Sequence, residues 1–315
     1  GQLDRAEAEA QTLLAQAEQL ADREAEAAAC SALARVRWMR GDYEGMRVVV
    51  RRQVEALRAA GRPQRDLTSA VCMLGLAEKC LGNYEAALGH YRAAFDDMAA
   101  DPELAIDTSG HVRLGNLLRS MGRLDEARAI LEAGRALARR TQQLANEPFL
   151  LTNLALVHES GAQLASARAL ADQAVESAAR YGEPHIKAAA LLCRARVTAA
   201  LASAGAADAA PAEADIRAAF AVWRELGSEP LAVQCVASAG LVLAQTPGAD
   251  PAAGLALVHW AMTHPAFVRS EREDAQTRLD RLTVPPEAAA RANGLLAPDA
   301  PLAQALQCLP ASWRP

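Results

Sequence analysis

The sequence has few aromatic residues and no long apolar run. Aromatic side chains make up 4% of the 315 residues, although 51% of the chain is hydrophobic, so alanine and leucine supply most of the apolar volume. This composition favours helices over sheets. No run of about 18 or more apolar residues occurs, and the first residues lack a charged region followed by an apolar one. We therefore expect no membrane span, no signal peptide and a cytoplasmic protein.

Basic tracts and paired cysteines are also missing. The formal net charge is -5, with acidic and basic residues interspersed, whereas a surface that binds nucleic acid is usually strongly basic. We therefore expect no direct contact with nucleic acid. The cysteines form no CxxC pair, which is typical of reduced cysteines that act as small buried hydrophobes. They are Cys30, Cys72, Cys80, Cys193, Cys235 and Cys308.

The sequence also lacks motifs that carry catalysis or hold a metal. It contains no GxxxxGK(S/T) phosphate loop, no GxSxG elbow and no HExxH pair. His259 and His264 are five residues apart, which does not place two ligands on one helix face. The charged run 270–281 has the i, i+4 spacing of a solvated helix face rather than that of an acid/base pair. We expect no enzyme, no cofactor and no metal site.

What the sequence does contain is a repeat. The stretch LGNYEAALGHYRAAF, residues 81–95, has counterparts about one helical hairpin upstream and downstream. Its glycine position recurs every 40 or 41 residues, at Gly1, Gly41, Gly82, Gly122 and, as alanine, Ala162. Five copies in one phase indicate a repeat protein, in which each unit stacks on its neighbours.

Each copy has the pattern of two helices. Apolar residues at helical spacing precede the glycine, and a second helix begins with Tyr84 and continues to Phe95. Small residues at Gly75 and Ala87 would let the two helix axes approach. One leucine precedes the small residue of each first helix, and we expect these leucines in the core. They are Leu33, Leu74, Leu114 and Leu154.

The spacing of small, aromatic and glycine residues resembles the tetratricopeptide (TPR) pattern, carried here by Gly75, Gly82, Tyr84, Ala87, Tyr91 and Ala94. The period near 40, against about 34 in the usual TPR, resembles the sensor domains of MalT-like, LuxR-type and SARP/AfsR-type regulators, which are signal-transduction (STAND) ATPases. The pattern is also similar to kinesin light chain and to the Rap-type peptide receptors of bacteria. The resemblance implies an all-α, right-handed superhelical solenoid of antiparallel helix pairs.

The regularity of the repeat decreases along the chain. The predicted parts of one continuous solenoid are regular TPR-like repeats with an incomplete first unit (1–181), degenerate helical hairpins with longer loops (182–265) and C-terminal capping helices (266–315). Because Gly1–Ala21 matches only a second helix, we expect a piece of a longer protein. That first helix would expose an apolar stripe, which favours self-association.

In TPR arrays the first helices of the hairpins line the concave surface, so the resemblance assigns groove positions. The candidate residues for contact with a ligand or partner are Arg35, Trp38, Lys79, Arg113, Asn116, Arg119, Phe149 and Asn153. Asn116 and Asn153 occupy positions at which peptide-binding TPR proteins bond the backbone of an extended ligand; otherwise they satisfy neighbouring helix backbone. Trp38 either anchors a partner or belongs to the core.

The groove differs from the family's clamp for a terminal carboxylate. That clamp needs a lysine where this chain has Val112, although Arg113 and Arg119 offer charge to an acidic ligand. We therefore predict a binding module: the sensor domain of a multidomain bacterial signalling or transcriptional regulator, whose concave groove takes a peptide, protein or small effector. The alternative is a stand-alone TPR adaptor that scaffolds protein–protein contacts.

Overall fold

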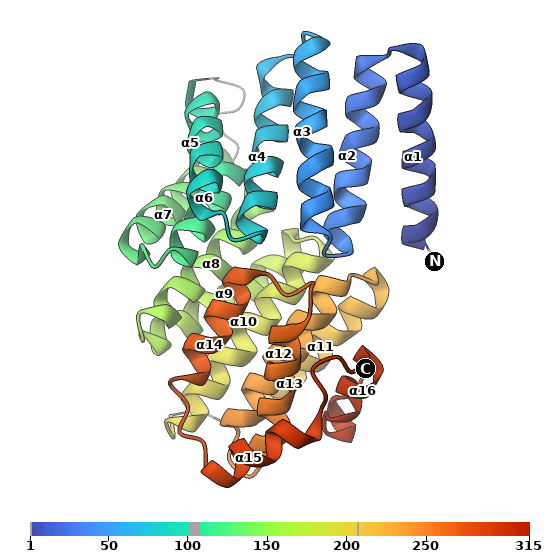
Figure 1. Ribbon diagram of the computed structural model, residues 1–315. Coiled ribbons are helices and arrows are strands. Elements are labelled where there is room, and N and C mark those ends of the chain that lie inside the picture. The colour runs from blue at the N-terminus through green and yellow to red at the C-terminus, as the bar shows by residue number, and fades with distance from the viewer. Residues whose placement is uncertain (1, 101–107, 207) are drawn as a thin grey trace.

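A computed structural model shows an array of antiparallel helix pairs (Figure 1). It describes residues 2–100, 108–206 and 208–315, so the phased Gly1 lies outside the described residues. Within those ranges the regular secondary structure is entirely helical, and successive helices pack on one another along the chain. This confirms the predicted all-α solenoid. None of the described helices combines the length and the apolar character needed to cross a membrane.

The first helices of the hairpins, here called the A helices, are α2 (Arg23–Met39), α4 (Gln64–Cys80), α6 (Ser109–Ser120), α8 (Glu147–Ser160), α10 (Pro184–Ser203) and α12 (Glu229–Gln245). The second helices, the B helices, are α3 (Tyr43–Ala59), α5 (Tyr84–Ala100), α7 (Leu124–Thr141), α9 (Leu164–Tyr181), α11 (Ala210–Leu226) and α13 (Pro251–Thr263). The helix α1 (Gln2–Leu20) precedes this array and packs on α2. After the array come α14 (Arg269–Leu279), α15 (Pro286–Leu295) and α16 (Leu302–Gln307).

The turn inside each of the first four hairpins contains one residue with left-handed backbone. Gly41, Gly82 and Gly122 have φ angles of 72°, 83° and 75°, and Ala162 has 59° at the same position. Glycine adopts this conformation without a steric penalty, whereas an L-residue with a Cβ does not. The phase predicted from the sequence therefore corresponds to one conformation repeated at four turns, including the turn where alanine replaces glycine.

Small residues hold the helices of a pair close together. A Cβ added to Gly75 would lie 2.6 Å from the Tyr91 ring of the following helix, so a larger side chain would separate α4 from α5. The leucine beside each such contact is buried, as predicted from its phase. The exposed fractions of Leu33, Leu74, Leu114 and Leu154 are 2%, 8%, 6% and 2%.

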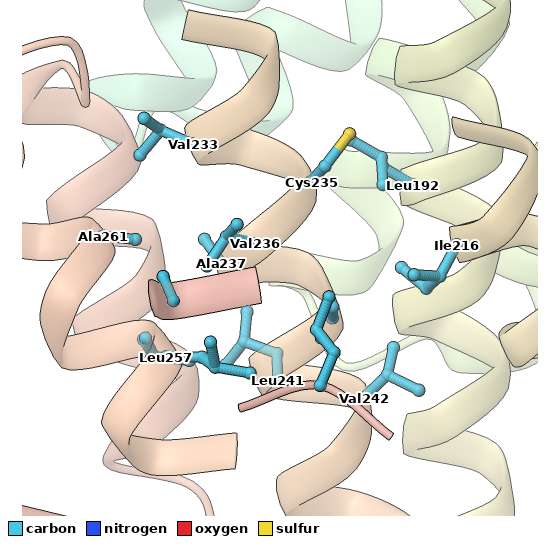
Figure 2. Packing of buried hydrophobic residues seen from close by; sticks show 14 of the residues in the cluster. Leu192, Ile216, Val233, Cys235, Val236, Ala237, Leu241, Val242, Leu257 and Ala261 are labelled. Carbon is cyan, nitrogen blue, oxygen red and sulfur yellow. The ribbon is translucent and has the colours of Figure 1, made fainter. Parts of the chain in front are cut away.

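The largest apolar cluster lies in the C-terminal half, between α10, α11, α12 and α13 (Figure 2). The helix α12 carries buried residues around most of its circumference, because α10, α11, α13 and α14 all pack against it. The tail covers α13: α15 packs on it, and the Trp260 indole N–H donates to the carbonyl of Ala300 at 2.8 Å. This half of the array is therefore an enclosed core rather than an open row of hairpins.

The array curves so strongly that residues far apart in the sequence meet on its concave side. The ring of Trp38, at the end of α2, lies 6.2 Å from that of His185, at the start of α10. Phe149 of α8 contacts the same imidazole, with ring centroids 5.7 Å apart. The concave side of the first five hairpins is consequently a narrow channel.

The left-handed alanine generates the first prediction. Ala162→Gly should raise the free energy of unfolding by about 1 kcal/mol, because glycine relieves a left-handed Cβ that costs roughly 1–2 kcal/mol and loses part of this gain to a more flexible unfolded chain. The measurement is urea unfolding followed by circular dichroism. The control is Ala133→Gly on the exposed face of α7, which should lower stability by about 1 kcal/mol. A loss of stability in both variants would contradict the assigned turn.

Candidate functional site

The chain returns into its own concave side after α13. Residues 264–282, here called the return segment, include α14 and pass between the early hairpins and the C-terminal core (Figure 1). The Tyr43 hydroxyl donates to the carbonyl of Ala266 at 3.0 Å. In the next hairpin the Tyr84 hydroxyl donates to the Glu273 carboxylate at 2.9 Å. The aromatic position of the first two turns therefore contacts the return segment as well as its own hairpin.

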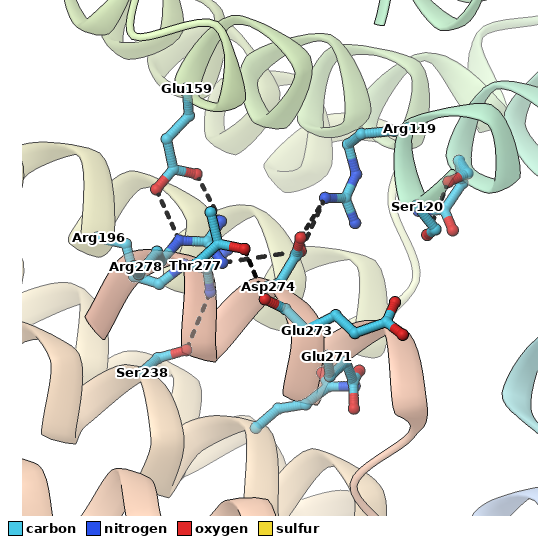
Figure 3. A network of polar contacts seen from close by, with 12 residues as sticks. Arg119, Ser120, Glu159, Arg196, Ser238, Glu271, Glu273, Asp274, Thr277 and Arg278 are labelled. Atoms are coloured by element: carbon cyan, nitrogen blue, oxygen red, sulfur yellow. Dashed lines mark hydrogen bonds and ion pairs between the residues drawn. The ribbon is translucent and has the colours of Figure 1, made fainter. Parts of the chain in front are cut away.

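Two arginine–carboxylate contacts hold α14 in the channel (Figure 3). One joins it to Arg119 and the other to Glu159. From α6, Arg119 Nη1 donates to both oxygens of Asp274, at 3.0 and 2.7 Å. From α14, Arg278 donates through Nε and Nη2 to the two oxygens of Glu159 on α8, at 3.0 and 2.9 Å. The prediction that residues 270–281 form a solvated face is therefore wrong for the side that carries Asp274 and Arg278.

The charges of these pairs are stabilised by their partners. Burial opposes ionisation of Asp274, but Arg119 and Arg278 lower its pKa to about 2. Burial also disfavours charge on Glu159, yet its pair with Arg278 lowers the Glu159 pKa and raises that of the guanidinium. Asp274, Glu159 and Arg278 therefore remain charged at neutral pH. Removing one member would leave the other as a buried charge without compensation.

A third carboxylate of α14 is in a different environment. Glu271 accepts hydrogen bonds from the Gln234 amide and from the backbone N–H of Val268. Burial raises its pKa to about 7, against the opposing influence of the Lys79 charge. Burial in turn lowers the pKa of Lys79. Glu271 is consequently a group at this site whose charge changes near neutral pH.

A cavity of about 210 Å³ separates α14 from the A helices. Of the residues predicted from groove positions, it is lined by Lys79, Asn116, Arg119, Phe149 and Asn153. Counting groove positions did not identify Arg196 on α10 or Gln234 and Ser238 on α12, because the repeat phase slips after Tyr181. Those residues and the return segment form the opposite wall.

The two predicted asparagines bond each other. The Asn116 amide donates to Asn153 Oδ1 at 2.6 Å, and the Asn153 amide donates to the carbonyl of Phe149 at 2.9 Å. Asn153 is buried, with 4% of its surface exposed. The pair therefore joins α6 and α8 at the cavity, which both asparagines line.

The other three predicted residues lie outside the cavity lining. Arg35 is exposed on α2, and Trp38 is half-buried against His185. Arg113 is also half-buried, and its Nη1 lies 3.9 Å from the sulfur of Met73. The structure thus brings five of the eight predicted residues to the cavity lining. In the ranges that the structure describes, no cluster of three or more His, Cys, Asp or Glu side chains has the arrangement of a metal site.

Comparison with solved structures assigns the fold. The chain is similar to BtubC (BKLC) from P. vanneervenii, with a TM-score of 0.54 and 17% identity over 72% of this chain and 93% of that one. It is also similar to the Rap conjugation gene regulator of the plasmid pLS20, solved in complex with a Phr peptide, with a TM-score of 0.60 and 13% identity over 92% and 78% of the two chains. No family model and no curated protein sequence matches. The chain thus has a TPR-like helical-repeat fold.

The raised pKa of Glu271 predicts a pH-dependent stability. Its folded-state pKa of about 7 lies above the value of about 4.3 in an unfolded chain, so its contribution favours folding at low pH and is lost as the pH rises from about 4 through 7. Between about pH 5 and pH 8, the free energy of unfolding of the wild-type chain should fall by on the order of 1–3 kcal/mol more than that of the Glu271→Gln variant. Urea unfolding at both pH values measures the difference.

The matched control for this prediction is Glu287→Gln, which changes an exposed glutamate on α15. Its pH profile should follow that of the wild-type chain. If Glu271→Gln also follows the wild type, Glu271 does not titrate in the folded state as described.

Proposed function

We propose that this chain is the ligand-recognition domain of a bacterial signalling or transcriptional regulator, and that its concave channel holds the ligand. One observation carries the proposal: a polar cavity lies where A helices from successive hairpins and the return segment meet. The residues around it include Lys79, whose ammonium makes no hydrogen bond with the described residues. A channel that served only as packing would be filled by apolar side chains.

The walls of the cavity come from distant parts of the chain, which supports a role in switching. Lys79 belongs to α4, Arg196 to α10 and Asp274 to α14. A ligand that contacts all three walls would favour one curvature of the array and one position of the return segment. Because α14 buries only Ser270 and Ala275 fully, it is held mainly by polar contacts, and its position is the one that a ligand in the cavity would affect most.

The fold comparisons support a binding role. The Rap regulator of pLS20 was solved with a bound peptide, and we extend ligand binding to this chain on the evidence of its own cavity. The long repeat period also resembles the sensor arrays of larger regulators. We propose no catalytic role, because the carboxylates Asp274 and Glu159 form ion pairs with arginines and the two asparagines bond each other, which leaves no acid/base pair among these groups.

The second candidate function is a scaffold, and an apolar surface on α1 favours it. Leu13 and Leu20 are 56% and 78% exposed, whereas Ala10 and Ala17 of the same helix are buried. An exposed leucine pair of this kind suits contact with another protein or a second copy of the chain. In that role the channel would remain a structural feature and the binding surface would lie at α1.

Ligand capture compared between variants tests the recognition role. The purified chain is incubated with the low-molecular-mass fraction of a lysate from its source cell, and retained species are identified by native mass spectrometry. Asn116→Ala/Asn153→Ala should reduce retention of the specific ligand at least about tenfold, the effect expected from losing one or two good hydrogen bonds. Circular dichroism verifies that the variant remains folded.

The control for the capture experiment is Gln11→Ala/Gln16→Ala, which removes two exposed amides of α1 outside the channel. It should retain the ligand as the wild-type chain does. Equal retention by all three proteins would reject the channel as the binding site, and loss in the α1 variant alone would support the scaffold.

A further inference from the structure

The cavity contains cationic groups that lack a complete set of protein partners. The Lys79 ammonium makes no hydrogen bond or ion pair with the described residues, although burial lowers its pKa. Arg119 uses Nη1 for Asp274, and its Nε is buried without a partner. Arg196 uses Nη1 for the Ser238 hydroxyl at 3.0 Å, and its Nε is likewise without a partner. Three cations therefore have unused donors at one cavity.

The carboxylates nearby are already engaged. Asp274 accepts from Arg119 and lies 3.7 Å from Arg278. Glu159 accepts both hydrogen bonds of Arg278. Glu271 accepts from an amide and a backbone N–H instead of pairing with a cation. The cluster has four cations, Lys79, Arg119, Arg196 and Arg278, against the ionised Asp274 and Glu159 and a Glu271 that is only partly ionised near neutral pH. Its excess positive charge is therefore at least one, and removing such a charge from water is costly.

Apolar side chains form another part of the cavity lining. Phe149, Leu156, Leu192, Leu241 and Phe267 come from α8, α10, α12 and the return segment. These side chains suit a hydrophobic ligand body, while the unused donors suit an anionic group. A cavity of roughly 150 Å³ is enough for a benzene-sized molecule, so about 210 Å³ accommodates one ring and a short substituent.

We propose that the cavity binds a small monocarboxylic acid with an apolar, ring-sized body. The carboxylate accepts hydrogen bonds from the Lys79 ammonium and from the Nη2 groups of Arg119 and Arg196, which make no hydrogen bond with the described residues, and its negative charge offsets the excess positive charge. The body packs on Phe149 and Phe267. This inference rests on the proposed recognition function and specifies its ligand class.

The apolar lining distinguishes a carboxylate on a ring from a phosphate at this site. Both anions would meet the excess positive charge, but a dianionic phosphate has a second charge close to Asp274 and Glu159. Inorganic phosphate also lacks the apolar body that Phe149 and Leu192 would contact. We therefore expect phosphate to bind more weakly than an aromatic carboxylate.

Isothermal titration calorimetry of the full chain tests the ligand class with three probes: benzoate, its neutral analogue benzamide, and inorganic phosphate. Benzoate should bind saturably with one site per chain. Benzamide should bind at least about tenfold more weakly, because it cannot form the charge-assisted hydrogen bonds. Phosphate should bind at least about tenfold more weakly than benzoate. Equal binding of benzoate and benzamide, or stronger binding of phosphate, would overturn the proposal.

Substitution of Lys79 provides a second test. Lys79→Met should weaken benzoate binding at least about tenfold, and it should raise the melting temperature of the ligand-free chain, because it replaces a half-buried ammonium that makes no hydrogen bond with an apolar side chain of similar length. The control is Lys187→Met, which changes the exposed second lysine of the sequence. It should alter neither quantity. A lowered melting temperature or an unfolded Lys79→Met chain would mean that the lysine has a structural partner, and would overturn the proposal.

The two proposals can fail separately. If benzoate does not bind but captured material still depends on Asn116 and Asn153, the ligand class is wrong and the recognition function stands. If benzoate does not bind and capture is unaffected by the asparagine substitutions, both are wrong. If benzoate binds and Lys79→Met leaves its affinity unchanged, the carboxylate does not bind at the position assigned to it.

Discussion

The buried ion pairs between the return segment and the ends of α6 and α8 determine how the concave side is built. Arg119 with Asp274, and Arg278 with Glu159, join residues more than a hundred positions apart. A charge removed from water needs a partner in good geometry, so these side chains fix α14 in one place and one orientation. The cavity, its lining and the environment of Glu271 all follow from that position.

Polar contacts and apolar burial have different tasks in this molecule. The array is held by leucines and alanines that repeat with the hairpins, and by the large cluster around α12 (Figure 2). The helix α14 of the return segment buries few apolar side chains and is held mainly by charge (Figure 3). Apolar burial changes little with pH or with a small anion, whereas charged contacts respond to both. The charged contacts of α14 should therefore respond to pH and to small anions, whereas the apolar packing of the helix pairs should not.

The energetic cost of an unpaired charge also explains why Lys79 indicates a functional site. A half-buried ammonium that makes no hydrogen bond or ion pair makes the protein less stable than a methionine would, so packing alone gives no reason for it. Functional sites are where such costs are found, because a ligand supplies the missing interaction. The unused donors of Arg119 and Arg196 beside it make a single ligand the common explanation.

The sequence by itself determined the repeat. The phase of Gly41, Gly82, Gly122 and Ala162 predicted four turns of one conformation, and the phased leucines predicted the core, because hairpin geometry depends on residues close together in the chain. Counting groove positions also placed Lys79 and Asn153 on the concave side, where both line the cavity. These features rest on local spacing, which a single sequence displays directly.

Only the tertiary structure decided what fills the concave side. Each hairpin is rotated slightly relative to the one before it, and over several hairpins the array curves until Trp38 contacts His185. The total curvature is not specified by any local sequence pattern. The run 270–281 has the spacing of an exposed helix, and its burial depends on that curvature and on two arginine–carboxylate pairs of long sequence separation. Residues on α10 and α12 were missed because the phase slips there. The cavity therefore exists only where distant segments meet.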